Sequence, residues 1–220
     1  MAKISERLKT IGDFVHEHAH VIDVGADHGL LEKYLIDNKK VDSILAVENK
    51  EGPYNILVNN LKGYDVQISL SDGLDEMSDD INTIVIAGMG GNLIMDILTK
   101  DVQKLNQIEQ IVVDAHRDAE LVRRSVTKLG YRIEKEQIVL ENGIYYFIIS
   151  FVKGYTKYKD IEYEFGVNIS NDPLFNQFKT QELNRLGKTL IFQRKAKIVK
   201  PEGIRNLQSK IERLETLWIQ

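Results

Sequence analysis

The chain has 220 residues with a formal net charge of −4 at pH 7, and 43% of them are hydrophobic, enough to bury the core of one α/β domain with a smaller appendage. It contains no cysteine, which excludes disulfides, thiolate metal sites and a cysteine nucleophile. The N-terminus lacks the apolar segment of a signal peptide, and no later apolar run approaches the about 18 residues of a membrane span. We therefore expect a cytoplasmic protein without membrane contact or metal.

Helices and strands are expected to alternate through the first 130 residues. Residues 5–19 carry apolar side chains at helical spacing, which predicts an amphipathic helix before the first strand. The expected strands are 20–24, 43–48, 66–70, 83–87 and 110–114, and the expected helices are 30–37, 53–61, 93–99 and 119–129. This alternation with short connections predicts right-handed βαβ units and a parallel sheet.

The pattern changes after Gly130. Residues 131–140 and 144–152 are extended runs joined by Glu141-Asn142-Gly143, and Asn-Gly between such runs is a strong hairpin signal. Five strands in βα units followed by a hairpin are typical of the seven-stranded, Rossmann-like methyltransferase sheet, whose last strand inserts antiparallel. A dinucleotide dehydrogenase half would keep alternating strands and helices.

Beyond this hairpin the periodicity is helical. Asp172-Pro173 is expected to be an N-cap with a proline at the first helical position, and Lys200-Pro201 marks a break before a second helix. The apolar positions expected between the two helices are Leu183, Leu186, Leu190, Ile204, Leu207, Ile211, Leu214 and Trp218. We expect a coiled-coil-like helical hairpin at 154–220, joined through residues 154–166 to a Rossmann-like domain at 1–153.

Basic side chains concentrate in the last third of the chain. Residues 153–220 hold about 13 Lys or Arg against about 8 Asp or Glu. The densest part, 179–210, has about nine basic side chains against Glu182 and Glu202. Such a face can contact the phosphates of a nucleic acid. The alternatives are an ordinarily solvated helix surface and a dimerisation or packing element.

The first predicted strand ends in Asp23-Val24-Gly25-Ala26-Asp27-His28-Gly29. Glycines at such a turn let the backbone approach a ligand while the next helix offers its N-terminus. The dinucleotide fingerprint G-x-G-x-x-G is not met, because Asp27 stands where its second glycine belongs. A D-x-G-x-D-x-G turn is moderately specific for S-adenosylmethionine, which brings an amino-acid end and a sulfonium instead of a pyrophosphate. For Asp23, the alternative is a carboxylate that bonds its own turn.

Acids and glycines also follow the next three strands. Glu48 ends the second strand, where an acid suits the ribose hydroxyls of any adenosine cofactor. Asp72-Gly73 follows the third, where the acid can accept from the adenine amine, although Asp-Gly is often merely a turn. The fourth ends in Ala87-Gly88-Met89-Gly90-Gly91. So many glycines suit a backbone that presses against a cofactor or a target base, the alternative being a plain glycine turn.

Over almost its full length the chain resembles the bacterial tRNA (adenine(22)-N1)-methyltransferases of the TrmK type. The resemblance rests on Ser5-Glu6-Arg7-Leu8, Asp23 to Gly29, Glu51-Gly52-Pro53, Ser71-Asp72-Gly73-Leu74, and above all Ile86-Ala87-Gly88-Met89-Gly90-Gly91 with Ile94 and Leu98. It implies a class I S-adenosylmethionine-dependent methyltransferase fold and S-adenosylmethionine and tRNA as ligands, with no obligate protein partner.

The expected site residues fall into three groups. For the cofactor they are Asp23, Gly25, Glu48, Asp72, Gly73 and Ala87. For the catalytic neighbourhood, which the resemblance implies, they are Asp27, His28, Gly88 and Met89. For tRNA they are Arg7, Arg185, Lys188, Arg194, Lys195 and Lys197. Asp27 is expected to stabilise the positive charge that methylation places on adenine, and His28 to orient it, touch the base or merely cap the next helix. The adenine itself must be unpaired or extruded.

The chain departs from the family pattern in two places. The fifth strand ends in Val113-Asp114-Ala115-His116 where the family has Leu-Gln-Pro-Asn, and Leu30-Leu31-Glu32-Lys33 lacks the usual proline. These departures concern substrate contacts and leave the expected fold and cofactor unchanged. The competing hypotheses are a methyltransferase acting on another RNA or a small molecule, and a catalytically silent RNA-binding protein of the same fold.

Overall fold

The computed structural model describes residues 4–195 and 201–217, in two compact units. The first unit ends at Tyr158 and the second begins at Lys159. The Tyr158 hydroxyl accepts a hydrogen bond from the backbone N–H of Ile133 at 2.8 Å, which ties the residues after the last strand to the sheet. Within the described ranges, no helix is long and apolar enough to cross a membrane. That 1–153 and 154–220 are separately folding domains stays a prediction.

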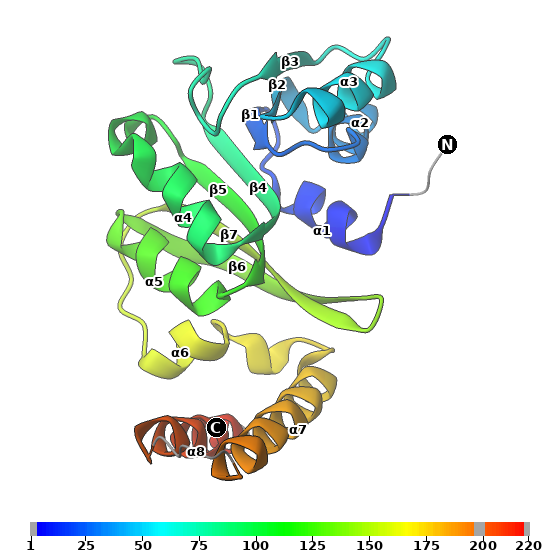
Figure 1. The fold of residues 1–220 in the computed structure, drawn as a ribbon. Coiled ribbons are helices and arrows are strands. Elements are labelled where there is room, and N and C mark those ends of the chain that lie inside the picture. The colour runs from blue at the N-terminus through cyan, green and yellow to red at the C-terminus, as the bar shows by residue number, and fades with distance from the viewer. Residues whose placement is uncertain (1–3, 196–200, 218–220) are drawn as a thin grey trace. The chain divides into compact units, whose positions relative to one another are not determined.

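The first unit is built on a seven-stranded sheet (Figure 1). Its strands are β1 (Ala19–Val24), β2 (Val41–Glu48), β3 (Gln67–Leu70), β4 (Thr83–Gly90), β5 (Gln110–Arg117), β6 (Tyr131–Glu141) and β7 (Ile144–Lys153). They lie in the order β3-β2-β1-β4-β5-β7-β6. The first five are parallel, and β7 inserts antiparallel between β5 and β6. The predicted sheet is confirmed.

Helices cover both faces of this sheet. They are α1 (Glu6–Phe14), α2 (Leu30–Asp37), α3 (Glu51–Asn60), α4 (Gly91–Lys100), a 3-10 turn at Val102–Asn106, and α5 (Ala119–Lys128). The helices α1 and α2 pack on Val21, Val85 and Val112 from neighbouring strands. Because side chains alternate along a strand, Ile84 and Ile111 face the other side, where Figure 1 shows α4 and α5.

Two strands continue beyond their predicted ends, into the region where the site lies. The strand β4 reaches Gly90 and β5 reaches Arg117, with shifts of register on either side of Met89. Gly88 has φ +76°, a left-handed conformation that breaks regular pairing at this point. The predicted glycine turn is therefore an irregular strand end that leads directly into α4.

The second unit contains a helix that the sequence pattern did not indicate. This helix, α6 (Asp160–Phe165), lies within the stretch expected to be a connection. Its first turn is closed by the Glu162 carboxylate, which accepts from the backbone N–H of Lys159 at 2.6 Å. At its end Phe165 is buried against Leu186 and Leu214. Six residues are too few to show a helical period, so the sequence pattern did not indicate this helix within the join.

The two long helices of this unit, α7 (Phe175–Arg194) and α8 (Pro201–Thr216), pack together as expected. Their shared core contains Leu183, Leu186, Leu207, Ile211 and Leu214. Trp218 lies outside the described residues.

The predicted start of the first long helix is wrong by two residues. The N-cap of α7 is Leu174, and the helix begins at Phe175. Asp172 instead accepts from the backbone N–H of Leu174 at 2.8 Å, which closes an Asx turn around Pro173.

Candidate active site

A cleft of about 420 Å³ opens at the carboxyl ends of β1 to β4, the edge where open parallel sheets bind ligands. Of the residues predicted for cofactor and catalysis, it is lined by Gly25, Asp27, Glu48, Asp72, Gly73, Ala87, Gly88 and Met89. Asp23 lines a smaller adjoining cavity of about 130 Å³, together with His28. The two spaces share Gly25, Asp27 and Gly88, so the predicted residues converge on one region.

The turn after β1 needs glycine at its first position. Gly25 donates its backbone N–H to the carbonyl of Val47 at 2.9 Å and has φ +81°. A Cβ atom built on Gly25 would lie 2.5 Å from Cε of Met89. Both the left-handed backbone and this close approach therefore exclude a larger residue without rearrangement. The turn consequently presents bare backbone to the cleft.

Glu48 is fixed by the same turn. One of its carboxylate oxygens accepts a hydrogen bond from the backbone N–H of Asp27 at 2.8 Å. Within the described ranges, no hydrogen bond uses the second oxygen, and the side chain is almost entirely buried at the edge of the cleft. A preoriented carboxylate with a spare acceptor suits the hydroxyl groups of a ribose.

Asp72 has a partner that sequence reasoning missed. The Nζ atom of Lys100, at the end of α4, lies 3.1 Å from the Asp72 carboxylate and 2.9 Å from that of Asp75. Both members of the Asp72–Lys100 pair are half exposed or more, so the pair contributes little to stability and can open. Lysine is common at the C-terminal end of a helix because it interacts favourably with the helix dipole. Its presence in the sequence therefore did not indicate a role at this site.

Asp27 and His28 stand at the mouth of the smaller cavity. Asp27 has φ +49°, and its carboxylate lies 3.7 Å from Nε2 of the His28 ring, too far for a hydrogen bond. Both side chains are more than half exposed. The backbone carbonyl of His28 accepts from the Asn60 side chain at 3.0 Å, which holds the loop against α3. The Asp27 carboxylate therefore accepts no hydrogen bond from a described residue and remains open to a ligand.

Arg7, predicted to contact tRNA, forms ion pairs with two acids in this structure. Its guanidinium bonds to the buried Asp114 at the end of β5 and, at 3.0 Å, to Glu141 at the end of β6. Its charged group also lies over the Tyr146 ring, which is tilted against His116. This network ties α1 to the sheet beside the smaller cavity. A phosphate contact by Arg7 stays a prediction that requires the network to open.

Sequence reasoning also did not single out Glu32, which α2 places beside Asp23. Glu32 is completely buried, and neither carboxylate oxygen has a hydrogen-bond donor among the described residues. The side chains of Asp23 and Glu32 are within hydrogen-bonding reach of each other. Ionised carboxylates only accept hydrogen bonds, so this contact requires a proton. A glutamate in the first turn of a helix is ordinarily a surface residue, so the sequence pattern did not indicate that Glu32 is buried.

Burial sets the proton affinity of this pair. It raises the pKa of Glu32 well above the usual range, and the charges of Asp23 and Glu48 act in the same direction. Burial also raises the pKa of Asp23 to about 7, although the hydrogen bond with Glu32 opposes this rise. The pair therefore holds at least one proton near neutral pH, as its geometry requires.

We expect this acid pair to make the protein less stable as pH rises. The folded pKa values exceed the ordinary values of 3.8 for Asp23 and 4.5 for Glu32. The folded state therefore binds more protons, and stability falls from about pH 4 through about pH 7. Glu32→Gln should raise the free energy of unfolding by about 1 to 3 kcal/mol at pH 8 and much less at pH 5, as urea denaturation would show. Asp37→Asn, on the exposed side of α2, should leave this pH dependence unchanged. An equally steep decline in Glu32→Gln would contradict the assignment.

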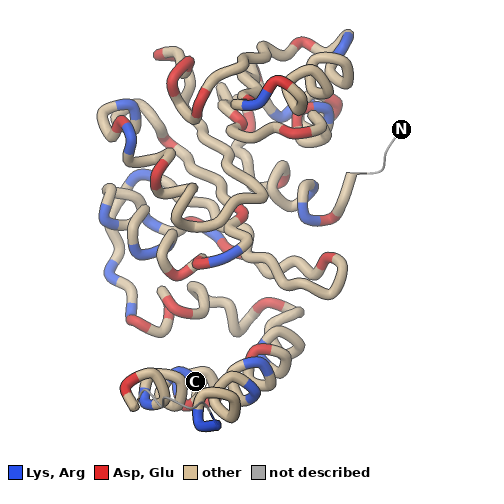
Figure 2. Tube along the Cα trace, viewed as in Figure 1, with Lys and Arg blue, Asp and Glu red and all other residues tan. Residues whose placement is uncertain are grey.

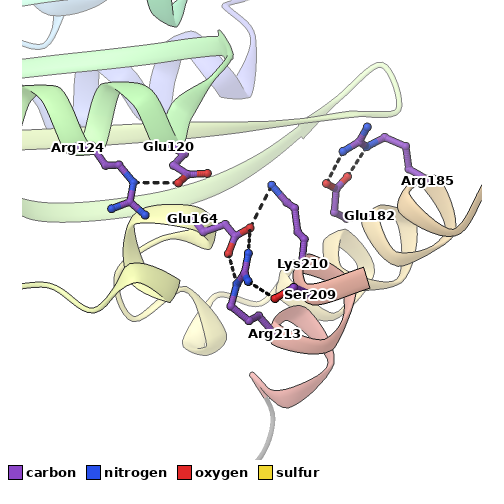
Figure 3. A network of polar contacts seen from close by, with 8 residues as sticks. All are labelled: Glu120, Arg124, Glu164, Glu182, Arg185, Ser209, Lys210 and Arg213. Carbon is purple, nitrogen blue, oxygen red and sulfur yellow. Dashed lines mark hydrogen bonds and ion pairs between the residues drawn. The ribbon is translucent and has the colours of Figure 1, made fainter. Parts of the chain in front are cut away.

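The predicted tRNA-binding cations other than Arg7 lie on the second unit, where Figure 2 shows Lys and Arg along α7 and α8. Several of the cations are engaged within the unit (Figure 3). Arg185 pairs with Glu182 at 2.6 Å, while Arg213 at 2.7 Å and Lys210 at 3.5 Å share Glu164. Of the predicted cations, those that are exposed and have no ion pair to any described residue are Lys188, Arg194 and Lys195. Lys197 lies outside the described residues.

The cleft residues fit S-adenosylmethionine. Glu48 and Asp72 offer acceptors for ribose hydroxyls and an adenine amine, and Leu93 and Ile97 give the cleft an apolar wall. A Cβ on Gly73 would already contact Ile97 at 3.4 Å, so a side chain there would narrow the space. The three acids that line the cleft, Asp27, Glu48 and Asp72, suit a ligand with net positive charge and would repel a pyrophosphate.

Comparison with known proteins identifies the class of this protein and its family. The chain matches the methyltransferase-domain family over residues 4–149. Together with the sheet order and the strand-end cleft, this makes it a Rossmann-like methyltransferase. It is 30% identical over 187 residues to the tRNA (adenine(22)-N(1))-methyltransferase of Bacillus subtilis (strain 168), covering 83% of this chain and 77% of that one. The chain belongs to the tRNA (adenine(22)-N1)-methyltransferase family.

Solved structures agree with this assignment. The Streptococcus pneumoniae protein Sp1610 in complex with S-adenosyl-L-methionine superimposes with a TM-score of 0.87 at 29% identity, covering 97% of this chain and 98% of that one. The M. capricolum TrmK in complex with S-adenosyl-homocysteine superimposes with a TM-score of 0.84, covering 97% and 96%. At 24% identity, the second comparison supports the fold alone.

Proposed function

We propose that this protein is a cytoplasmic enzyme that transfers the methyl group of S-adenosylmethionine to N1 of adenine 22 in tRNA. One observation carries the proposal: the acids and glycines at the carboxyl ends of four adjacent strands form a single cleft. All of these residues except Glu48 belong to the motifs on which the family resemblance rests. The Bacillus subtilis relative and the complex of the Streptococcus pneumoniae protein support the substrate and the cofactor, respectively.

Each side chain of the cleft has a simple task in this reaction. Glu48, Asp72 and Gly73 bind and orient the adenosine part, and the turn at Gly25 receives the remainder. When bound, S-adenosylmethionine supplies a methyl group activated by the positive charge of its sulfonium. The protein mainly aligns this group with the acceptor nitrogen, and alignment alone can supply roughly 7 to 11 kcal/mol in well-oriented cases. No covalent nucleophile is needed.

The smaller cavity is the proposed place of the target adenine. It adjoins the cleft at Gly25, Asp27 and Gly88, so an adenine there would lie next to the cofactor. Positive charge moves onto the base as N1 is methylated, and the carboxylate of Asp27 can stabilise it. A base that must expose its Watson–Crick edge has to leave the stack, which a cavity beside the cleft accommodates.

Transfer of a labelled methyl group from S-adenosylmethionine tests the proposed reaction. We expect the purified protein to label bulk tRNA and to leave ribosomal RNA and free adenosine unlabelled. Label in another RNA or in a small molecule, without label in tRNA, would favour a methyltransferase with a different substrate. No label in any acceptor, with normal cofactor binding by calorimetry, would favour a silent RNA-binding protein.

We expect the exposed cations of α7 to hold tRNA through its phosphates. Replacing Lys188, Arg194 and Lys195 together with glutamine should lower tRNA affinity, and the slope of log affinity against log salt should shrink by about two to three. Filter binding at several salt concentrations measures both. Arg185→Gln is the matched control with a smaller expected effect, because Arg185 is paired with Glu182. Unchanged affinity and slope in the triple variant would indicate that the hairpin is a packing or dimerisation element.

A further inference from the structure

We propose that Glu32 is a positioning residue that couples cofactor binding to the release of a proton. In the free protein Glu32 and Asp23 share a proton, and binding of the cationic S-adenosylmethionine drives that proton into solvent. This inference rests on the proposed cofactor and goes beyond it, because it assigns a role to a side chain that no substrate touches. Its chemical consequence is a pH-dependent preference for S-adenosylmethionine over the demethylated product.

The position of the pair makes this coupling possible. Asp23 lines the smaller cavity, and Glu32, its neighbour, is completely inaccessible to solvent. This cavity adjoins the cofactor cleft at Gly25, Asp27 and Gly88. A charge in the cleft acts on the pair through protein interior, where electrostatic interactions are stronger than in water.

Among the described residues, no other side chain donates a hydrogen bond to Glu32. Neither of its oxygens meets a donor among the described residues, and an unmet buried acceptor is costly. The charged and titratable groups on α1, β1, α2, β2 and the turn before α2, besides the pair itself, are Glu6, Arg7, Lys9, Asp13, His20, Asp27, His28, Lys33, Tyr34, Asp37, Asp42 and Glu48. Of these, Glu48 acts on both acids and adds negative charge. The cation of Arg7 is already matched by Asp114 and Glu141.

The sign of the coupling follows from the charges. S-adenosylmethionine carries a sulfonium, an ammonium and a carboxylate, so a net positive charge enters the cleft when it binds. A cation favours the ionised form of the acid pair, so binding expels a proton and becomes tighter as pH rises. S-adenosylhomocysteine lacks the sulfonium charge and should expel less. Removing the titration of Glu32 should abolish the difference.

Calorimetric titration of the full chain tests the inference. Between about pH 5.5 and pH 7.5 we expect wild-type affinity for S-adenosylmethionine to rise about three- to tenfold more than that for S-adenosylhomocysteine. Titrations in buffers of different ionisation enthalpy should show proton release. Glu32→Gln keeps the shape and gives Asp23 a permanent N–H donor. It should bind S-adenosylmethionine several-fold tighter than wild type at the lower pH, equally well at the higher pH, and with less proton release than wild type.

The comparison isolates the pair formed by Glu32 and Asp23. The cofactor titrates in both proteins, so the difference between the two pH profiles reports this acid pair. Asp37→Asn removes an exposed carboxylate from the same helix and should behave as wild type. Loss of packing would weaken binding at every pH, so a gain confined to low pH cannot arise from damage.

Two results would overturn the inference. One is an identical pH dependence in wild type and Glu32→Gln. If Glu32→Gln does not fold, infrared difference spectra of the wild type provide the test. Cofactor binding should remove the band of a protonated carboxyl group. An unchanged band is the second result that would contradict the inference. Absence of S-adenosylmethionine binding by wild type at every pH would instead overturn the proposed cofactor, and this inference with it.

Discussion

Replacing Glu48 with alanine is expected to weaken S-adenosylmethionine binding by about 100-fold, roughly 2.7 kcal/mol. Two effects add up. The variant loses a charged acceptor for the ribose hydroxyls, worth about 1.5 to 3 kcal/mol. It also loses the hydrogen bond that holds the backbone of Asp27, so the turn after β1 is less well ordered. Calorimetric titration with S-adenosylmethionine measures the change.

Two controls make the Glu48 result specific. Asp42→Ala removes an exposed acid from the other end of the same strand and should leave binding unchanged. Thermal unfolding without cofactor should show that Glu48→Ala retains its fold. Cofactor affinity within about twofold of wild type would show that the acid at the end of β2 does not hold the ribose.

Replacing Asp27 with asparagine is expected to lower the rate of methyl transfer by about 100-fold, a typical loss when one preorganised electrostatic group is removed. Asparagine tolerates the left-handed backbone at this position, where φ is +49°, so the variant removes charge without straining the turn. The charge matters most when the adenine becomes cationic, so cofactor affinity should change by less than about threefold. Single-turnover assays and calorimetry measure the two quantities.

A comparison of rate and affinity interprets the Asp27 result. If affinity falls as much as rate, Asp27 belongs to the binding residues and not to the catalytic ones. His28→Gln is the control at the neighbouring position. The ring of His28 lies 3.7 Å from the Asp27 carboxylate without a hydrogen bond. We therefore expect His28→Gln to reduce the rate of methyl transfer by less than about tenfold.

The sequence predicted the fold and most of the cleft because both depend on local patterns. Alternating apolar runs fix the strands, and the residues that follow parallel strands meet at one edge of a sheet wherever the helices pack. This is why Gly25, Glu48, Asp72 and Gly88 could be assigned to one site before their distances were known. The Asn142-Gly143 turn likewise identified the hairpin that closes the sheet.

The features that sequence reasoning missed depend on contacts between distant segments. Glutamate is a residue type that usually lies on the surface, and only the packing of α2 on β1 makes Glu32 a buried partner of Asp23. The sequence gives no sign that Arg7 is paired, because its partners Asp114 in β5 and Glu141 at the end of β6 are distant along the chain. Pairwise charge contacts across about 100 residues leave no periodic signal.

Mass-spectrometric mapping of a single tRNA transcript tests the central claim most directly. The transcript carries adenine at position 22 and is compared with one carrying guanine there, after reaction with the full chain and S-adenosylmethionine. The proposed function predicts 1-methyladenosine at position 22 of the first transcript and no methylation of the second. Methylation at another position, methylation at N6 instead of N1, or equal methylation of both transcripts would contradict it.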